Sequence, residues 1–181
     1  MRARAEAAGE TRGRILQAMG QLYFEKPLGE ITLDDVAAQA GVSVQTVLRH
    51  VGSRDALMRS AAKNLRDDVQ AERQAPPGDV ARAVEAIVGH YELRGDGVLR
   101  LLGQEDHDQE LRHALDGGRR IHREWVQRVF ETADPELTDL LVVATDVYAW
   151  KLLRRDAGLS RRTTEARMRR LVEAVLKGGK K

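Results

Sequence analysis

The stretch LDDVAAQAGVSVQTVLRHV, residues 33–51, holds two short segments with helical spacing, separated by only Gly41, Val42 and Ser43. Each segment is long enough for about two helical turns, and helices of that length are not stable alone in water. Apolar residues recur at core spacing in both segments, namely Val36, Ala37 and Ala40 in the first and Val47 and Val51 in the second. The two segments are therefore expected to pack against each other and against a larger core.

Capping residues mark where each short helix begins and ends. Thr32, with Asp35 three residues later, predicts a capping box at the start of the first helix. Gly41 suits the left-handed conformation needed at the turn, and Ser43 is a preferred N-cap for the second helix. Two short helices joined by a three-residue turn with a glycine are typical of a helix-turn-helix, in which the first helix braces the second.

The second helix has the dimensions of a DNA-reading element. Residues 44–51 are expected to span about 12 Å, comparable with the roughly 12 Å width of the DNA major groove. Val47 and Val51 are expected to face the core. The outer surface then carries Gln45, Thr46, Arg49 and His50. Such side chains can donate to guanine, pair with adenine or contact phosphate, whereas a buried surface would require apolar residues.

Helical patterns continue on both sides of this stretch. Thr11 is predicted to cap a first helix that carries an apolar stripe and stops at Pro27 and Gly29. Ser53 is predicted to open a longer fourth helix after the break at Gly52. The first 70 or so residues therefore read as a four-helix unit. The segment APPGD, residues 75–79, cannot continue a helix and is the predicted boundary.

The chain divides on this basis into three parts: an N-terminal arm with the helix-turn-helix (residues 1–52), a connecting helix (residues 53–74) and a C-terminal domain (residues 75–181). In the C-terminal domain we expect a helix that breaks at residues 95–97, and an amphipathic helix weakened in its middle by Gly117 and Gly118. We also expect a helix that starts at Pro135 and continues to Leu152, and a last helix over residues 163–176. The predicted fold class is all-α.

Composition excludes several classes of protein. Apolar residues make up 42% of the 181 residues and charged residues 32%, with only 4 prolines, which favours a soluble helical globule over a disordered chain. The longest apolar run, residues 140–144, is too short to cross a bilayer, and the N-terminus lacks a hydrophobic signal core, so we expect a cytoplasmic protein. The absence of cysteine excludes disulfides, thiolate metal sites and cysteine nucleophiles.

Charge is unevenly distributed along the chain. Residues 74–148 hold 8 basic and 15 acidic residues, while residues 149–181 hold 11 basic and 3 acidic residues. Within residues 43–66 five basic residues face a single acid, Asp55; the five are Arg49, Arg54, Arg59, Lys63 and Arg66. This local excess begins at the second short helix. It predicts a patch able to meet a polyanion, with an ordinary solvated face as the alternative.

The residues TRGRILQAMGQLYFEKPLGEITLDDVAAQAGVSVQTVLRHVGSRDALM, 11–58, resemble the DNA-binding region of the tetracycline-repressor (TetR) family of bacterial transcriptional regulators. The run ITLDDVAAQAGVS and the SRDAL start of the next helix occur in order and at family spacing. The resemblance is strong over about 40% of the chain. The end YAWKLLRRDAGLSRRTTEARMRRLVEAVL is similar to the terminal helices of some actinobacterial members.

This chain departs from the family pattern in the second short helix. Leu48, His50 and Val51 stand where the family usually has aromatic residues, so a tyrosine contact with phosphate is not carried over to Leu48. Leu48 and Val44 are expected instead to suit thymine methyl groups. Arg54 stands at a family lysine position, and its charge at a helix N-terminus favours a phosphate. The predicted DNA-binding residues are Thr32, Ser43, Val44, Gln45, Thr46, Leu48, Arg49, His50 and Arg54.

The resemblance implies a homodimer of all-helical chains that binds a palindromic operator and senses a small-molecule effector in the C-terminal domain. Dimerisation is implied through the last two long helices, which offer two apolar faces: Leu140, Leu141, Ala144, Val147 and Tyr148, then Met168, Leu171, Val172 and Val175. The alternative is that these faces pack only within one chain. A repressor released by its ligand is the default expectation, and activation remains open.

The effector itself is not readable from the residues. Polar side chains on otherwise apolar stripes are candidates to line an effector cavity, and each has an ordinary core or surface role as its alternative. These candidates are Tyr91, Gln104, Asp106, His122, Trp125 and Tyr148. No cofactor and no metal are expected.

Two other classes of function are weighed against this one. A metal-dependent helical bundle would need two Glu-x-x-His motifs, and the sequence has one, Glu110 with His113. Walker, GxSxG and HExxH motifs are absent from the sequence, so an enzyme is not expected. A non-specific architectural DNA-binding protein would be far more basic than a chain of net charge +2.

Overall fold

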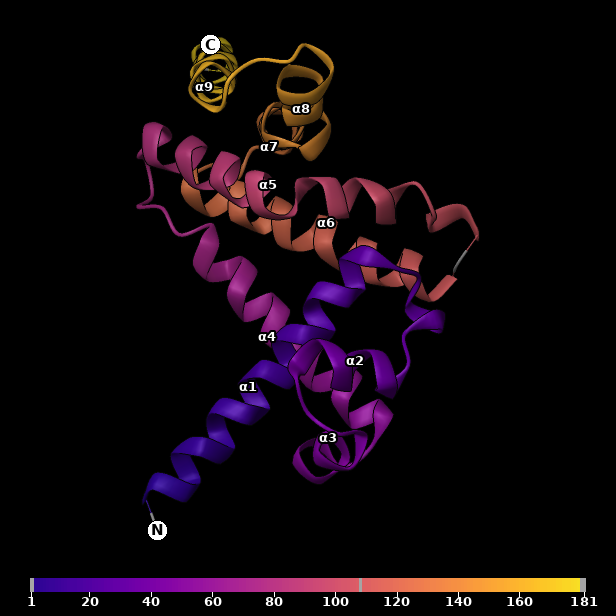
Figure 1. Cartoon of the computed structure of the whole chain (residues 1–181). Helices are drawn as coiled ribbons and strands as arrows, with labels where there is room; N and C mark the ends of the chain where they lie inside the picture. Colours follow the sequence, from indigo (N-terminus) through magenta and orange to yellow (C-terminus); the bar gives the residue numbers. More distant parts are fainter. Residues whose placement is uncertain (1, 108, 180–181) are drawn as a thin grey trace. The chain divides into compact units, whose positions relative to one another are not determined.

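The structure is a computed structural model of the whole chain, and it describes residues 2–107 and 109–179. The described residues form helices, turns and loops and contain no strand, so the predicted all-α fold class is confirmed. By their internal contacts they divide into two compact units, residues 1–70 and 71–181. Figure 1 shows the helices coloured along the chain. No helix of the described part combines the length and the apolar character needed to span a membrane.

The first unit is built from three helices and most of a fourth. Its elements are α1 (Arg2–Glu25), the short 3-10 turn η1 (Leu28–Glu30), α2 (Leu33–Ala40), α3 (Val44–Val51) and α4 (Arg54–Glu72), whose last two residues belong to the second unit. The buried side chains of α1 lie at helical spacing and pack on α2 and α3. This core consists of Ile15, Leu16, Ala18, Met19, Leu22, Ile31, Val36, Ala37, Ala40, Val47, Leu57 and Ala61.

The prediction that Thr11 caps the first helix is wrong. Helix α1 begins at Arg2, and the Thr11 hydroxyl lies inside it, where it donates to the carbonyl of Ala7 over 2.9 Å. Threonine in a helix interior often bonds back to the carbonyl four residues earlier, so a capping residue type did not mark a helix start here.

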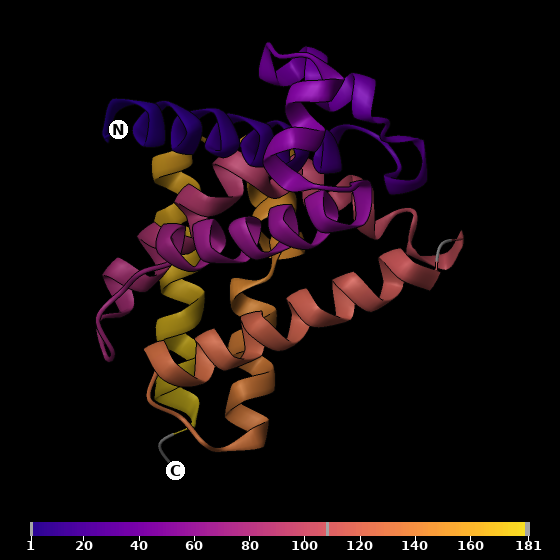
Figure 2. The ribbon, with the colours of Figure 1, turned by 90° about the horizontal axis from the view of Figure 1, so that it is seen from below.

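The second unit holds the remaining helices around its own core. Its elements are α5 (Val80–Leu102), η2 (Glu105–His107), α6 (Gln109–Val129), α7 (Pro135–Thr145), α8 (Val147–Lys151), the π-helical turn η3 (Leu152–Asp156) and α9 (Arg161–Gly178). Helix α9 packs on α5 and α7, and Figure 2 shows α7 and α9 side by side. Val84, Ile87, Leu141, Trp150 and Met168 are fully buried where these helices meet.

The helix α5 runs through residues 95–97 without the predicted break. A Cβ atom built on Gly95 would lie 2.6 Å from Cζ3 of Trp150, a distance that real Cβ atoms do not tolerate. Gly95 therefore serves close packing of the Trp150 ring against α5 rather than a turn. Helix α6 likewise passes through Gly117 and Gly118.

The helix expected from Pro135 to Leu152 is divided at Asp146. Asp146 has an extended backbone (φ −70°, ψ 155°), and its carboxylate accepts the backbone N–H of Tyr148 over 2.8 Å. An aspartate side chain that bonds the backbone two residues on competes with helix continuation. The last helix begins at Arg161 behind its N-cap Ser160, two residues before the predicted start.

Candidate nucleic-acid interface and interior polar network

The turn between α2 and α3 has the geometry that its residues predict. The Thr32 hydroxyl accepts the N–H of Asp35 over 3.1 Å, and the Asp35 carboxylate accepts the N–H of Thr32 over 2.8 Å, which completes the capping box. Gly41 ends α2 in the left-handed conformation (φ 67°, ψ 39°). Ser43 caps α3 by accepting the N–H of Thr46 over 3.1 Å. Residues 33–51 therefore form a helix-turn-helix.

One residue that the sequence did not single out reinforces the capping box. Nζ of Lys26 lies 2.7 Å from Oδ1 of Asp35. This ion pair, together with the hydrogen bonds from Thr32, holds the pKa of Asp35 well below its usual range. The Asp35 carboxylate is therefore ionised at neutral pH. It binds the N–H of Thr32 at the start of α2 and the side chain of Lys26, the residue after the end of α1.

The outer surface of α3 carries both polar and apolar side chains. Val47 is fully buried, which fixes the rotation of the helix about its axis. Gln45, Leu48 and Arg49 are exposed. Of the other predicted contact residues in the turn and α3, Ser43 is exposed, and Val44, Thr46 and His50 are half-buried. Val44 packs against the core of the first unit, and the Thr46 hydroxyl lies 3.0 Å from the Ser43 hydroxyl.

Arg54 and Thr32 lie beside the helix-turn-helix in the first unit. Nη2 of Arg54 donates to the carbonyl of Ile31 over 3.3 Å, so the guanidinium is tied to the residue that precedes Thr32. Both side chains are exposed. Ser53 caps α4 by accepting the N–H of Ala56 over 3.1 Å, as its position predicts.

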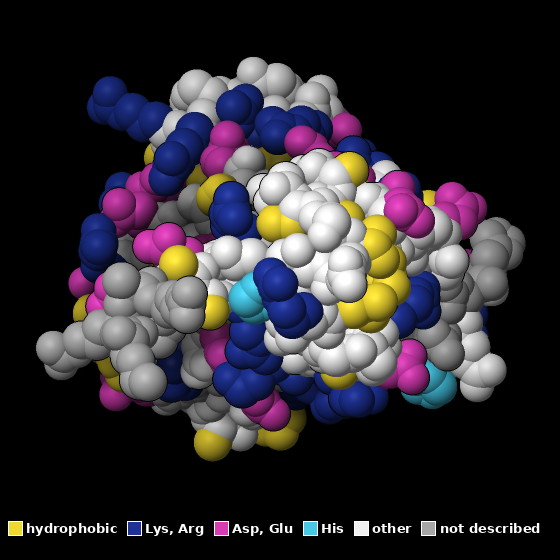
Figure 3. Space-filling model, turned by 60° about the horizontal axis from the view of Figure 1, so that its bottom comes forward, with side chains coloured by type: hydrophobic (Ala, Val, Ile, Leu, Met, Phe, Trp, Pro, Cys, Tyr) yellow, Lys and Arg dark blue, Asp and Glu magenta, His cyan; other side chains and the backbone are white. Residues whose placement is uncertain are grey.

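The basic patch is smaller than the sequence suggests. Lys63 pairs with Asp67 over 2.9 Å one turn along α4, which neutralises one of the five basic residues. Arg49, Arg54, Arg59 and Arg66 remain exposed. Figure 3 shows that basic side chains and a histidine lie next to uncharged and apolar side chains on the surface seen from below.

The second unit contains a polar network centred on His90, which is only 2% exposed. Nη2 of Arg73 lies 2.7 Å from Nε2 of His90, and Nδ1 of His90 lies 2.6 Å from Oε2 of Glu72. A guanidinium can only donate, so Nε2 accepts and the proton of the neutral ring is on Nδ1, which donates to Glu72. Arg94 completes the set with hydrogen bonds of 2.6 and 2.9 Å to the two Glu72 oxygens.

The charges of this network follow from its burial. Burial lowers the pKa of His90 to about 4, against the effect of its hydrogen bond to Glu72. Burial alone would raise the pKa of Glu72, but hydrogen bonds from His90 and Arg94 outweigh it and lower that pKa to about 2. At neutral pH a neutral imidazole therefore bridges an arginine and a carboxylate. The residues predicted from the sequence do not include His90 or Arg94. They lie three and seven residues after the buried Ile87, and this helical spacing indicates that they share the inward face of α5.

Three of the six predicted effector residues lie together in this interior. The Tyr91 hydroxyl donates to the carbonyl of Thr145 over 3.0 Å, and the Thr145 hydroxyl lies 3.2 Å from Nε2 of His122. The Trp125 ring stacks on the His122 ring with centroids 5.6 Å apart. Trp125 also donates from Nε1 to the carbonyl of Arg73 over 2.8 Å. The helices α5, α6 and α7 and the end of α4 are thus joined through polar side chains.

Two buried polar atoms of this interior have no hydrogen-bond partner among the described residues. They are Nδ1 of His122 and Nε of Arg73. Burial also lowers the pKa of His122 to about 3, so its ring is neutral. The Thr145 hydroxyl donates to the carbonyl of Leu141 over 2.7 Å, so Nε2 of His122 carries the ring proton and donates to Thr145, and Nδ1 is left as an acceptor.

The other three predicted effector residues lie apart from this interior. The Gln104 amide donates to the carbonyl of Arg100 over 3.1 Å at the end of α5. Asp106 is exposed and pairs with Arg112 over 3.3 Å. Tyr148 is 52% exposed on α8. The structure therefore does not bring the six residues into one site.

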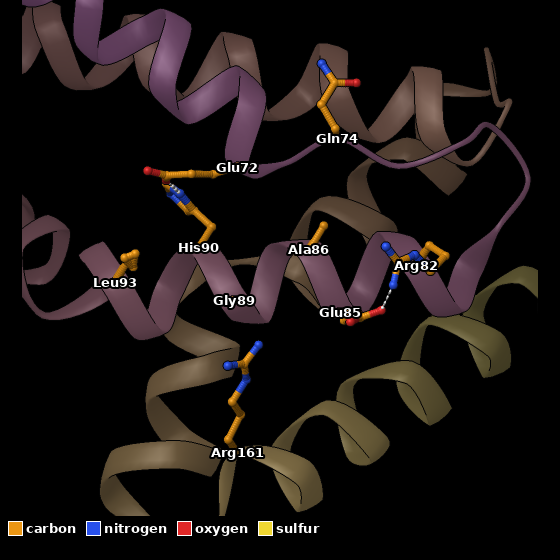
Figure 4. A pocket seen from close by; sticks show the side chains of 9 residues that line it. All are labelled: Glu72, Gln74, Arg82, Glu85, Ala86, Gly89, His90, Leu93 and Arg161. Carbon is orange, nitrogen blue, oxygen red and sulfur yellow. Dashed lines mark hydrogen bonds and ion pairs between the residues drawn. The ribbon is translucent and has the colours of Figure 1, made fainter.

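A surface pocket of about 340 Å³ lies over α5 in the second unit. Figure 4 shows its lining side chains, with Glu72 bonded to His90 and Arg82 bonded to Glu85. Arg161 approaches Gly89 from the start of α9. None of the six predicted effector residues lines this pocket. Its lining consists of Glu72, Gln74, Arg82, Glu85, Ala86, Gly89, His90, Leu93 and Arg161.

The described residues contain no group of three or more histidine and carboxylate side chains placed to hold a metal ion. The side chain of Glu110, half of the Glu-x-x-His motif, lies outside the described residues, and His113 is exposed.

Comparison with known proteins relates the chain to regulators of transcription. No protein-family model matches it. Over 80 residues it is 34% identical to the HTH-type transcriptional regulator AlkX of Mycobacterium tuberculosis. The aligned segment makes up 44% of this chain and 35% of AlkX. The chain therefore aligns with about a third of the length of that relative.

Solved structures resemble the chain over nearly its whole length. A TetR-family transcriptional regulator from Streptomyces coelicolor matches with a TM-score of 0.64 over 93% of this chain and 81% of its own, at 18% identity. A transcriptional regulator from Rhodococcus sp. Rha1 matches with a TM-score of 0.64 over 92% of this chain and 96% of its own, at 21% identity. The fold is that of TetR-family regulators, and each of these matched proteins is named as a regulator of transcription.

Proposed function

Because the fold is that of TetR-family regulators and the N-terminal sequence is related to a helix-turn-helix regulator, we propose that this chain is itself a TetR-family transcriptional regulator that binds duplex DNA. The observation that carries this proposal is the orientation of α3. Val47 is fully buried, while Gln45, Leu48 and Arg49 point to solvent from the opposite side of a helix about 12 Å long. Such a helix fits a major groove.

The partner sequence is a palindromic operator, read by two copies of the chain. One α3 can read only a few base pairs, and a dimer places two such helices in successive major grooves about 34–36 Å apart. The contacts expected within each half-site come from the exposed Gln45 and Arg49 to base edges and from Arg54 to phosphate. Binding of this kind takes place where the chromosome is, which in a bacterium is the cytoplasm.

Apolar side chains left on the surface of the second unit support a homodimer through the last helices. Five of the residues predicted for the shared faces are buried within one chain: Leu141, Ala144, Val147, Met168 and Val172. The predicted Leu140, Tyr148 and Leu171 stay exposed at 50%, 52% and 44%. Val143 and Leu152, which were not predicted, are exposed at 68% and 62% on α7 and η3. Exposed apolar side chains gathered on consecutive elements are typical of an interface between copies.

The effector site is proposed in the interior around His122, Trp125 and Tyr91. Its support is the pair of buried unpartnered atoms, Nδ1 of His122 and Nε of Arg73, which offer one acceptor and one donor to a small molecule. A ligand regulates DNA binding only if it binds two states of the dimer with different affinity. Arg73 follows α4, which starts beside the helix-turn-helix in sequence, so α4 is the element proposed to carry the change. Release of a repressor by its ligand is the default.

The full chain tests the DNA-binding proposal. Selection of duplexes from a randomised pool should enrich an inverted repeat whose half-site centres lie about one helical turn apart. The double variant Gln45→Ala with Arg49→Ala should enrich no sequence, whereas Arg128→Ala, an exposed arginine of α6, should enrich the same repeat. Failure of the unaltered chain to enrich any duplex would overturn the proposal.

The effector proposal has a separate test. The unaltered chain and a His122→Ala variant are screened by thermal shift against a panel of small neutral and cationic organic compounds. We expect at least one compound that stabilises the unaltered chain, does not stabilise the variant and changes the affinity for the selected duplex. Compounds that stabilise both proteins equally would place the effector elsewhere.

A further inference from the structure

Leu48 is the large apolar side chain left exposed in the described part of the first unit. It is 37% exposed on α3, between turns that carry the polar side chains of Gln45 and Arg49. Residues 45, 48 and 49 are three and four positions apart, so they share one face of the helix. The reading face of α3 is therefore a polar stripe with one apolar side chain in its middle.

The orientation of Leu48 is fixed by both ends of α3. Val47, the preceding residue, is fully buried and points about 100° away around the helix axis. Ser43 caps the start of the helix, and at its end the N–H of Gly52 donates to the carbonyl of Leu48 over 2.7 Å. An eight-residue helix held at both ends cannot turn Leu48 into the core without exposing Val47. Leu48 therefore stays on the reading face when DNA is bound.

The chemistry of the major groove gives such a side chain one apolar partner on the bases. The base edges present hydrogen-bond donors and acceptors, and the C5 methyl group of thymine is the apolar group among them. We propose that Leu48 is a specificity-determining residue that contacts the C5 methyl of a thymine in each operator half-site, next to the bases read by Gln45 and Arg49. This inference rests on the proposed DNA-binding function. It adds a preference for thymine at the base pair that faces Leu48.

Deoxyuridine provides the test, because it pairs as thymine does and lacks only the C5 methyl group. The duplex enriched from a randomised pool by the full chain serves as the probe, and each thymine of its half-sites is replaced singly by deoxyuridine. Burial of one methyl-sized group corresponds to about a four-fold change in affinity. We expect one thymine in each half-site whose replacement weakens binding by about four-fold for the unaltered chain and not at all for Leu48→Ala.

A matched control separates this contact from a general effect of losing a leucine. Leu93, on α5, is an exposed leucine of the second unit, and Leu93→Ala should keep the full response to deoxyuridine. Circular dichroism confirms that each variant is folded. The inference is overturned if deoxyuridine has no effect at any position, if it weakens Leu48→Ala as much as the unaltered chain, or if the enriched half-site contains no thymine. Failure to enrich any duplex would instead contradict the proposed function itself.

Discussion

Nδ1 of His90 lies 2.6 Å from Oε2 of Glu72, while Nε2 of the same ring lies 2.7 Å from Nη2 of Arg73. The neutral imidazole thus joins a carboxylate on the last residue of α4 to the guanidinium of the next residue. Because His90 is fixed on α5, this arrangement holds the end of α4 and the start of the following loop in the second unit. The network also determines how that unit responds to substitution and to pH.

Replacement of His90 by alanine should destabilise the second unit. The change leaves Arg73 without its acceptor in a buried environment, which costs about 1–3 kcal/mol. Urea unfolding followed by tryptophan fluorescence measures this unit, since both tryptophans, Trp125 and Trp150, belong to it. His113→Ala removes an exposed histidine of α6 and should leave the unfolding midpoint nearly unchanged. Equal midpoints for the two variants would contradict a structural role for the His90 network.

Stability should fall as the pH is lowered from about 6.5 to about 4. The pKa of His90 is lowered to about 4 and that of His122 to about 3, mainly by burial. Between these values and the ordinary histidine pKa of about 6.5 the unfolded chain binds protons that the folded chain does not, so the free energy of unfolding decreases. Each histidine contributes a slope of up to about 1.4 kcal/mol per pH unit.

Glu72, whose pKa is lowered to about 2, adds a further loss that starts only below about pH 4.5. Urea unfolding at several pH values checks the histidine contribution. His122→Gln should show a shallower pH dependence than the unaltered chain. An unchanged slope in His122→Gln would show that His122 is not the buried neutral group described here.

Two glycines of the second unit should respond in opposite directions to alanine. At Gly95 the added Cβ would lie 2.6 Å from the Trp150 ring, and such overpacking costs about 1–3 kcal/mol. At Gly118, in α6, nothing lies within 4 Å of the added Cβ, so alanine should stabilise the helix by about 0.5–1 kcal/mol. Urea unfolding of both variants provides the comparison. Stabilisation by Gly95→Ala would exclude the packing role of this glycine.

Loss of Arg49 should weaken operator binding without affecting the fold. Arg49→Ala is expected to cost about 1–3 kcal/mol if the guanidinium reads a base, with the loss concentrated at one position of the half-site. Arg54→Ala should instead reduce the salt dependence of binding by about one ion, since its predicted contact is with phosphate. Fluorescence anisotropy at several salt concentrations measures both effects. A salt dependence unchanged by Arg54→Ala would reject the phosphate contact.

A charge placed on the exposed apolar surface of α7 should separate the dimer. Val143 is 68% exposed, and Val143→Arg would put an unpaired guanidinium in the proposed interface. Light scattering after size exclusion should give the mass of one chain for this variant and of two chains for the unaltered protein. Leu93, on α5, is about as exposed as Val143, and the Leu93→Arg variant should remain dimeric. A dimer that tolerates Val143→Arg would move the interface away from this surface.

The sequence by itself determined the helix-turn-helix. Thr32, Gly41 and Ser43 act within a few residues of themselves, through caps and a left-handed turn, so local chemistry sets where α2 and α3 begin and end. The burial of Val47 follows from the same spacing. The face that α3 presents to solvent was therefore readable from a stretch of less than twenty residues.

Only the tertiary structure decided what the isolated glycines, histidines and aromatic residues of the second half do. Gly95 continues a helix because the Trp150 ring, 55 residues later in the chain, fills the space beside it. Similarly, Glu72, Arg73 and His90 form a network because α5 brings together side chains that are distant along the chain. Contacts of this kind depend on which helices become neighbours. A short sequence pattern does not predict which helices pack together, because this depends on the burial of apolar faces across the whole unit.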